Sequence, residues 1–385
     1  MKTKFNILIL LKPERGYDRD VLRGIARYSR VDGPWSFYTN PISKKIPELV
    51  KEWPADGIIC IHTKTNSINV NAILKLNIPS ILPFHENLNK KNVIQLQFDN
   101  HAFGKCAADH LISCGFKNLA FCPSVDRPWL QQRRKGFQEV VYKKGLEYYA
   151  YQVPKNKKKN SWANEQLFMV DWLKSLPKPV GIMADVDERS AQVIEACQIA
   201  DLTVPTEVAI IGVENDDLIC ELSYQPLSSV ALNAELSGFE AAKMLGQIMR
   251  GKKPGKNIIV IEPAYTVTRA STDTVAVNDE IVAKAVQFIK ENPRKNLQVS
   301  DVADEVCVSK RLLYKRFNHA TGYTPYDAIR RSRNEEIAKL LVETNMTITG
   351  IAEMLGFNNI AHIARTFKQK MGMSTTAYRK KHSKK

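Results

Sequence analysis

Cationic, aromatic and amide side chains recur along one face of a short helix that the sequence predicts in the last quarter of the chain. Within Lys310–His319, Leu313 and Phe317 lie four residues apart and predict one buried face. Side chains of the types on the opposite face hydrogen-bond to base edges and phosphates when a helix lies in the major groove of DNA. We therefore expect this face to bind DNA, and the predicted contact residues are Ser309, Lys310, Arg311, Tyr314, Lys315 and Asn318.

A second helix nearer the C-terminus repeats this pattern. Ile363 and Phe367 form its buried pair, as Leu313 and Phe317 do in the first helix. Ile360 and Ala361 offer thymine methyl groups an apolar contact but no hydrogen bond, so we expect the first helix to dominate sequence specificity. The predicted DNA contacts of the second helix are Asn359, Ile360, Ala361, His362, Arg365 and Lys368.

Helix caps and turn residues predict the elements that position these two helices. Ser300 and Ser309 are predicted N-caps on either side of a tight turn at Cys307 and Val308, and Gly322 ends the second helix. Thr324 and Pro325 begin a longer helix that continues through Leu341. Thr347, Gly356 and Gly372 then mark a second cap, turn and end. The pattern predicts two helix-turn-helix units, residues 300–322 and 347–372.

The residues of this segment resemble the AraC/XylS family of transcription regulators. The resemblance is carried by Ile351-Ala-Glu-Met-Leu-Gly-Phe357, by Arg365-Thr-Phe-Lys368 and by the ending Ser374 to Tyr378. Thr375 and Thr376 stand where the family usually has a proline-containing sequence. The resemblance implies that residues 293–385 form a DNA-binding domain.

The distribution of charge separates this interpretation from an ordinary helix bundle with basic outer faces. The 385-residue chain has a formal net charge of +16. Residues 275–385 hold 20 Lys and Arg against 11 Asp and Glu, so this last part carries +9 of the total. Binding to phosphate requires an excess of cations where the contact helices lie, which favours DNA binding.

The preceding 270 or so residues alternate between short apolar runs and amphipathic segments, which is typical of βαβ units with a parallel sheet. A region of that length is more comfortable as two lobes than as one core. The predicted strands are Asn6–Leu11, Gly57–Ile61, Ser80–Pro83, Val93–Gln97, Leu119–Cys122, Gly181–Ala184, Ala209–Val213 and Ile258–Glu262. The predicted helices include Asp18–Tyr28, His101–Ser113, Gln131–Lys144, Arg189–Ala200 and Leu236–Met249.

Four stretches of this region resemble the effector domains of the LacI/GalR family. They are Val204-Pro-Thr-Glu-Val-Ala-Ile-Ile-Gly-Val-Glu-Asn215, Leu227–Val230, Phe239–Gly251 and Arg269-Ala-Ser-Thr272. The resemblance implies an α/β, two-lobed, periplasmic-binding-like sensor domain over residues 1–274, followed by an all-α domain with two helix-turn-helix motifs. Residues 275–292 are then a linker, Val275–Val277, with a first helix, Asn278–Asn292.

In folds of this kind a small ligand lies beyond the carboxyl ends of the strands. Asp, Asn and Arg suit the vicinal hydroxyls of a sugar because they form charge-assisted and multidentate hydrogen bonds. Each candidate also has a plainer interpretation: Arg133 as a solvated helix residue, Asp99 and Asp187 as N-caps, Asp18 and Arg19 as an exposed turn. Glu214 stands where the family usually has Asp. The predicted ligand residues are Asp18, Arg19, Asp99, Arg133, Asp187, Glu214 and Asn215.

Together the two resemblances imply a regulator that responds to a small sugar, and we expect a pentose such as xylose, activation of pentose-use genes, double-stranded DNA as partner and a homodimer. A small-molecule-binding protein whose helical domain only oligomerises is the alternative. The acidic cluster Glu214–Asp217 allows a glycosidase, but no nucleotide-loop, hydrolase or zinc-protease motif accompanies it, so we expect no enzyme. Seven cysteines without a C-x-x-C pair indicate no metal, and we expect no cofactor. The first apolar run lacks a cleavage site and is too short to span a membrane, so we expect a cytoplasmic protein.

Overall fold

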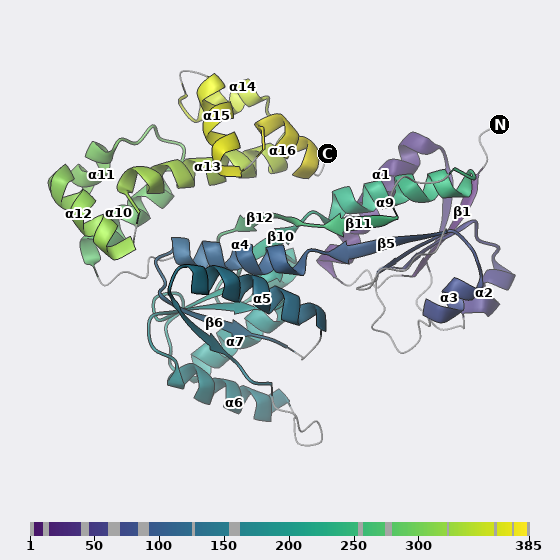
Figure 1. Ribbon diagram of the computed structural model, residues 1–385, viewed down its shortest axis with the longest axis horizontal. Helices are drawn as coiled ribbons and strands as arrows, with labels where there is room; N and C mark the ends of the chain where they lie inside the picture. The colour runs from purple at the N-terminus through teal and green to yellow at the C-terminus, as the bar shows by residue number, and fades with distance from the viewer. Residues whose placement is uncertain are drawn as a thin grey trace. The chain divides into compact units, whose positions relative to one another are not determined.

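The chain folds as two compact units, Met1–Asp99 with Leu232–Pro263, and Asn100–Ala231 with Ala264–Lys385 (Figure 1). We call the first unit lobe 1. Within the second unit, the α/β part is lobe 2 and residues 279–382 are the helical segment. The computed structural model describes residues 4–10, 15–39, 46–60, 70–83, 92–124, 128–153, 162–252, 257–273, 279–321, 323–357, 360–371 and 373–382.

Lobe 1 is built on a six-stranded sheet with the order β11-β5-β4-β3-β1-β2, in which neighbouring strands run parallel. Its strands are β1 (Phe5–Leu10), β2 (Trp35–Thr39), β3 (Gly57–Cys60), β4 (Ser80–Pro83), β5 (Val93–Phe98) and β11 (Ile258–Ile261). Its helices are α1 (Gly16–Asp32), α2 (Ile46–Glu52), α3 (Val70–Lys75) and α9 (Ala234–Met249).

Alternation along β1 shows how this sheet buries both faces. Ile7 and Ile9 pack into one core with α1 and α9, whereas Leu8 and Leu10 pack into another with α2 and α3. A strand buried on both sides has little room for polar residues. That is why Ile7–Leu10 of β1 is a continuous apolar run.

Lobe 2 is also built on a six-stranded sheet, with the order β12-β10-β9-β8-β6-β7, in which the neighbours from β10 to β7 run parallel. Its strands are β6 (Asn118–Cys122), β7 (Glu147–Ala150), β8 (Val180–Ala184), β9 (Val208–Glu214), β10 (Ser228–Leu232) and β12 (Pro263–Val267). Its helices are α4 (Asn100–Ser113), α5 (Pro128–Lys143), α6 (Trp162–Ser175), α7 (Asp187–Ile199) and α8 (Asp217–Leu222). Helices α6, α7 and α8 contribute to one core of this sheet.

Helices α4 and α5 cross at reciprocal glycines (Figure 1). A Cβ atom on Gly104 would lie 2.0 Å from the carbonyl oxygen of Arg133, and one on Gly136 would lie 2.0 Å from that of His101. Only glycine permits backbones to approach this closely. The crossing therefore fixes the start of α5, which carries Arg133, against the first turns of α4.

The helical segment contains seven described helices (Figure 1). They are α10 (Glu280–Glu291), α11 (Val299–Glu305), α12 (Lys310–Thr321), α13 (Pro325–Glu343), α14 (Ile348–Met354), α15 (Ile360–Met371) and α16 (Thr375–His382). Helices α10, α11, α12 and the start of α13 share one hydrophobic core. The rest of α13 shares a second core with α14, α15 and α16.

Arg333, near the middle of α13, joins these two cores. Its Nη1 donates to Asn296 Oδ1 at 2.7 Å, its Nη2 donates to the carbonyl oxygen of Leu355, and its guanidinium lies 3.9 Å from the centre of the Phe357 ring. Asn296 precedes α11, while Leu355 and Phe357 follow α14. One buried cation thus ties the loop before α11 and the turn after α14 to the same helix.

This architecture confirms the predicted fold class, an α/β domain followed by an all-α domain with two helix-turn-helix motifs. One predicted cap is wrong: Gln298, not Ser300, is the N-cap of α11, in a reciprocal capping box with Asp301. Thr324 and Thr347 cap α13 and α14 as predicted. Val275–Val277, Gly322, Asn359 and Gly372 lie outside the described residues.

Candidate effector half-site and nucleic-acid interface

The predicted ligand residues of lobe 2 gather at the carboxyl ends of β8 and β9. Asp187 begins α7 and is fully buried. Its carboxylate accepts hydrogen bonds from Ser229 Oγ at 2.6 Å and from the Asp216 backbone N–H at 2.8 Å. Val186, not Asp187, is the N-cap of α7, so the cap interpretation of Asp187 is wrong. Asp187 instead ties the β8 turn to the ends of β9 and β10.

Electrostatics at Asp187 reflect this buried position. Burial raises the pKa of its carboxyl group to about 7, while the hydrogen bonds from Ser229 and Asp216 act in the opposite direction. A carboxyl group that titrates near neutrality and borders a ligand edge is typical of functional sites.

Glu214 and Asn215 form a turn in an unusual backbone conformation. Their φ angles are 111° and 51°, both in the left-handed region that residues other than glycine seldom adopt. The Asn215 N–H donates to Ser229 Oγ at 3.0 Å, and Asn215 Oδ1 accepts a hydrogen bond from Arg269 Nη1 at 2.9 Å. Such a conformation costs about 1–3 kcal/mol per residue and persists only where neighbours hold it. Ser229 and Arg269 are those neighbours.

Arg133 is buried, with 3% of its surface exposed, so the interpretation as a solvated helix residue is wrong. Its guanidinium donates to the Asp185 carbonyl oxygen and, at 2.9 Å, to Asn100 Oδ1, and it lies 5.2 Å from the centre of the Phe103 ring. Burial lowers the pKa of Arg133, and the nearby carboxylates of Glu214, Asp185 and Asp187 oppose that shift. Lobe 2 thus gathers a cation, three acids and an amide at one edge of its sheet.

Asp185 is a member of this cluster that the sequence prediction missed. Its side chain is fully buried, accepts a hydrogen bond from Ser124 Oγ at 2.6 Å and has its pKa raised by burial. The signal was present, because Asp185 directly follows a predicted strand and lies two residues before Asp187. Arg269 was also missed, since an arginine distant in sequence gives no sign that it holds Asn215.

Lobe 1 places its predicted ligand residues after β1 and β5. Asp18, in the first turn of α1, is fully buried, so the exposed-turn interpretation is wrong for it, while Arg19 is partly exposed. Asp99 directly follows β5 and is half-buried. The Tyr17 and Phe98 rings lie 5.3 Å apart, which brings these two segments together within the lobe.

The six side chains that the sequence predicts as DNA contacts of the first helix are all exposed on α12 or at its start. Leu313 and Phe317 are fully buried on its inner face. Ser309 begins the helix by accepting a hydrogen bond from the Leu312 N–H at 3.3 Å. The exposed residues are Ser309, Lys310, Arg311, Tyr314, Lys315 and Asn318.

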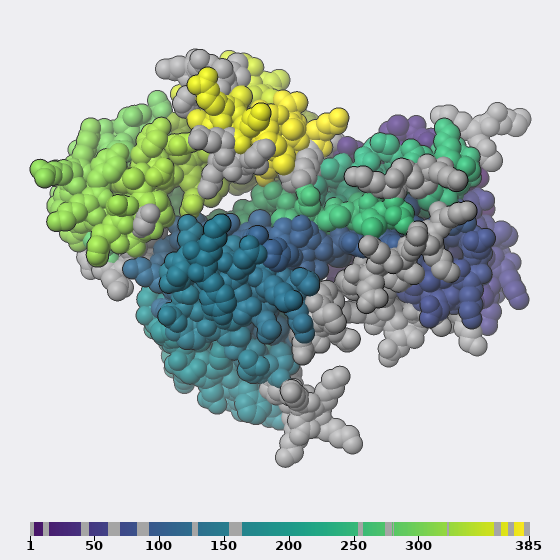
Figure 2. All heavy atoms as spheres, in the orientation of Figure 1, coloured from purple at the N-terminus to yellow at the C-terminus, as the bar shows by residue number. Residues whose placement is uncertain are grey.

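Helix α15 has the same arrangement in the second unit. Ile363 and Phe367 are fully buried, and Arg365 and Lys368 are exposed. Ile360, Ala361 and His362 lie in the first turn of α15. The turns before the two helices also match, because Cys307 and Gly356 both have positive φ angles, 54° and 65°. Figure 2 shows the first helix-turn-helix unit in green and the second in yellow, and atoms of both are visible on the face that it shows.

Two families of known domains match the chain. A periplasmic binding protein-like domain matches residues 108–272, and a helix-turn-helix domain matches residues 302–381. The xylose operon regulatory protein of Escherichia coli K12 is 27% identical over 98% of this chain and 97% of its own length. That of Haemophilus influenzae is 27% identical over 97% and 98%.

The chain therefore joins a periplasmic binding protein-like domain to a helix-turn-helix domain of the AraC type. The solved structure of the xylose-binding transcription activator xylR matches this chain over 100% of both chains, with a TM-score of 0.62 and 27% identity. A LacI-type protein from Alkaliphilus metalliredigens, solved with D-xylulofuranose, matches 70% of this chain at 21% identity, with a TM-score of 0.51. This match supports the fold of the α/β part. The relatives with full-length matches are regulators rather than enzymes. Among the described residues, no helix is both long and apolar enough to cross a membrane.

Proposed function

We propose that this regulator binds a small sugar, a pentose such as xylose, and that the bound sugar changes its action on DNA. The observation that carries the proposal is the buried Arg133 near the carboxylates of Glu214, Asp185 and Asp187, because these groups suit a ligand rich in vicinal hydroxyls. The similarity to xylose operon regulatory proteins along nearly the whole chain supports the same ligand class.

A thermal-shift screen of the full-length chain tests the ligand class. D-Xylose, L-arabinose, D-ribose and D-glucose are compared at equal concentrations. A ligand at a hundred times its Kd stabilises the folded state by about 2.7 kcal/mol, so a true effector raises the melting temperature by several degrees. The proposal predicts the largest shift for a pentose. No shift with any of the four sugars would contradict it.

The exposed faces of α12 and α15 are the proposed DNA contacts. Their cations and amides support binding to duplex DNA over a role in oligomerisation alone. A mobility-shift assay with the full-length chain and duplexes selected from random sequence tests this proposal. Strong salt dependence with a preferred sequence is expected, and absence of any shifted band would favour the oligomerisation alternative.

For the mechanism we propose that one sugar engages Asp18, Arg19 or Asp99 of lobe 1 together with Arg133 or Asn215 of lobe 2. Such a ligand favours a closed arrangement of the lobes because it binds that arrangement better. A tenfold difference in affinity shifts the equilibrium by about 1.4 kcal/mol. Small-angle scattering with and without sugar tests the closure, and an unchanged radius of gyration at saturating sugar would contradict it.

Activation of pentose-use genes by a homodimer completes the proposal. Expression of a reporter behind the selected DNA site should rise when sugar is added, and a fall would make the regulator a repressor. Sedimentation analysis of the full-length chain at micromolar concentration tests the dimer, and a single monomer species with DNA present would exclude it.

A further inference from the structure

We call the cluster of Arg133, Asp185, Asp187, Glu214 and Asn215 in lobe 2 the effector half-site. Helix α4 contacts this half-site at one end and the helical segment at the other. At its N-terminus, Asn100 Oδ1 accepts the hydrogen bond from Arg133. At its C-terminus, the Ser113 carbonyl oxygen accepts one from the Tyr323 hydroxyl at 2.8 Å. A helix of this length, 14 residues, spans about 20 Å.

Tyr323 lies in the turn between α12 and α13, so this contact reaches the first helix-turn-helix unit directly. Its ring packs 5.7 Å from that of Phe317, the buried anchor of α12, and the Arg331 guanidinium lies 5.3 Å from it. Burial raises the pKa of Tyr323 to about 12, so the hydroxyl keeps the proton that it donates to Ser113. Any displacement of Ser113 is therefore transmitted through Tyr323 to Phe317, in the core beneath α12.

A second route leads from Asn215 to the same place. Arg269, which holds Asn215 Oδ1, begins the short segment 269–273. Within it, Thr272 donates to Ser228 Oγ at 2.7 Å, and Asp273 Oδ1 lies 3.7 Å from Lys290 Nζ of α10. Ser228 in turn donates to the Arg269 carbonyl oxygen at 2.9 Å, which closes the loop of contacts.

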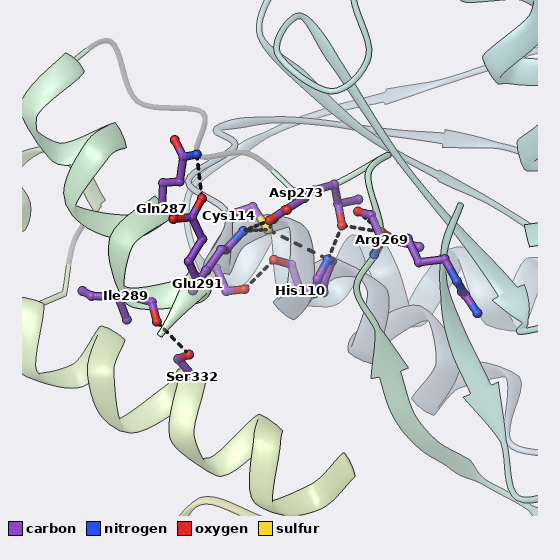
Figure 3. Close-up of polar contacts among 12 residues, drawn as sticks. His110, Cys114, Arg269, Asp273, Gln287, Ile289, Glu291 and Ser332 are labelled. Carbon is purple, nitrogen blue, oxygen red and sulfur yellow. Dashed lines mark hydrogen bonds and ion pairs between the residues drawn. The ribbon is translucent and has the colours of Figure 1, made fainter. Parts of the chain in front are cut away.

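The two routes meet where His110 of α4 contacts Thr272 (Figure 3). His110 Nε2 and Thr272 Oγ1 are 2.8 Å apart. The protons of Thr272 and Ser228 are both committed in the chain just described, so His110 must be the donor from Nε2. Burial lowers the pKa of His110 to about 4, so the ring is neutral at physiological pH. Cys114, one turn further, donates to the Thr272 carbonyl oxygen at 3.6 Å and accepts from Lys290 at 3.9 Å.

We propose that the His110–Thr272 hydrogen bond is a coupling joint that carries occupancy of the lobe 2 half-site to Tyr323 and Lys290 of the helical segment. This inference rests on the proposed sugar response. A sugar hydroxyl that donates to Asn215 Oδ1 shares this acceptor with Arg269 and so displaces segment 269–273. A sugar hydroxyl that binds Arg133 displaces the start of α4 through Asn100. In this proposal the turn at Glu214 and Asn215, with its two positive φ angles, is the element that changes arrangement when sugar binds.

The test measures coupling rather than binding. DNA affinity of the full-length chain is determined by fluorescence anisotropy with and without saturating D-xylose, on a duplex selected from random sequence. The ratio of the two Kd values is the coupling factor, which in regulators is typically about 5- to 150-fold. Thr272→Val removes the hydroxyl and keeps the volume. Thr268→Val, an exposed residue on the adjoining strand end, is the matched control.

We expect Thr272→Val to reduce the coupling factor toward one, with sugar affinity and sugar-free DNA affinity within about threefold of wild type, whereas Thr268→Val leaves all three unchanged. Tyr323→Phe should reduce the coupling in the same way, with exposed Tyr326→Phe as its control. If both residues act on one route, the double variant loses no more coupling than the stronger single variant.

Two failures are distinguishable. If wild type couples sugar to DNA and Thr272→Val couples equally well, the joint is wrong and the sugar response stands. If wild-type DNA affinity does not respond to sugar at all, the proposed function fails, and the joint fails with it. Should Thr272→Val prove unstable, His110→Phe, which removes the Nε2 donor from the other side of the same hydrogen bond, decides the question.

Discussion

Among single residues, Arg133 matters most for sugar binding, because it is a buried cation near the carboxyl ends of the lobe 2 strands. Arg133 has its guanidinium held by Asp185 and Asn100 and is surrounded by carboxylates, so its donors are already oriented. An oriented donor loses little entropy when it binds a hydroxyl. That pre-organisation is the reason to expect Arg133 to dominate sugar affinity.

Replacement of Arg133 by alanine should therefore weaken sugar binding by about 10- to 100-fold, the loss of one charge-assisted hydrogen bond. Isothermal titration with D-xylose measures it, and Arg134→Ala, an exposed neighbour on the same helix, is the control. Any change in sugar-free DNA affinity should be smaller than the loss of sugar affinity, because Arg133 contacts the start of α4 rather than a DNA-contact helix. Equal sugar affinity in the two variants would remove Arg133 from the site.

On the DNA side, Arg311 and Lys315 are expected to read bases. Arg311→Ala should cost about 1–3 kcal/mol on the preferred duplex and less on unrelated sequences. Lys284→Ala, which removes an exposed cation from α10, should weaken both duplexes little. Anisotropy titrations on the two duplexes measure the difference. A loss for Arg311→Ala that is equal on every sequence would mean that this residue contacts phosphate only.

At the element scale, the crossing of α4 and α5 is the feature most sensitive to a single methyl group. Gly104→Ala places a Cβ 2.0 Å from the Arg133 carbonyl oxygen, so the helices must separate. We expect a loss of about 1–3 kcal/mol in stability together with weaker sugar binding, measured by urea unfolding and titration. Gly350→Ala in α14 meets no atom closer than 3.3 Å and is the control. A destabilisation no greater than that of the control would show that the crossing adapts.

The sequence predicted most elements whose pattern is set by burial on both faces. Strands β3 to β6, β8 and β9 lie within two residues of prediction, because continuous apolar runs between polar turns allow little else. Strands β2 and β7 were missed. Each lies at the edge of its sheet and consists mainly of exposed or partly buried residues, so neither gives an apolar run. Gln298 was missed as a cap because its role depends on the reciprocal bond with Asp301.

The candidate site was less accessible to sequence analysis than the fold. Position after a strand identified Asp187, Glu214 and Asn215, since strand ends share one edge of the sheet. Arg269 and Thr272 could not be recognised in the same way, because their importance lies in contacts with residues more than 40 positions away. The positive φ of Glu214 likewise has no sequence signature, whereas Asn215 is of a residue type that adopts the left-handed region more readily.

At the scale of the whole molecule, two different helix-turn-helix units are joined through one helix. Arg333 holds both units to α13, so they should bind DNA as one body. Each chain is then expected to protect two successive major-groove segments about 34 Å apart, on an asymmetric site. Hydroxyl-radical footprinting measures the pattern. Protection of one groove segment per chain would mean that the second unit does not bind.

Sugar binding in the α/β part must also change how the two helix-turn-helix units bind DNA. The most direct measurement is the Kd of the full-length regulator for its selected duplex across a titration of D-xylose. We predict a change of at least about fivefold that saturates with sugar and is lost in Arg133→Ala. A Kd that stays constant at every sugar concentration, in a protein shown by titration to bind the sugar, would contradict the account.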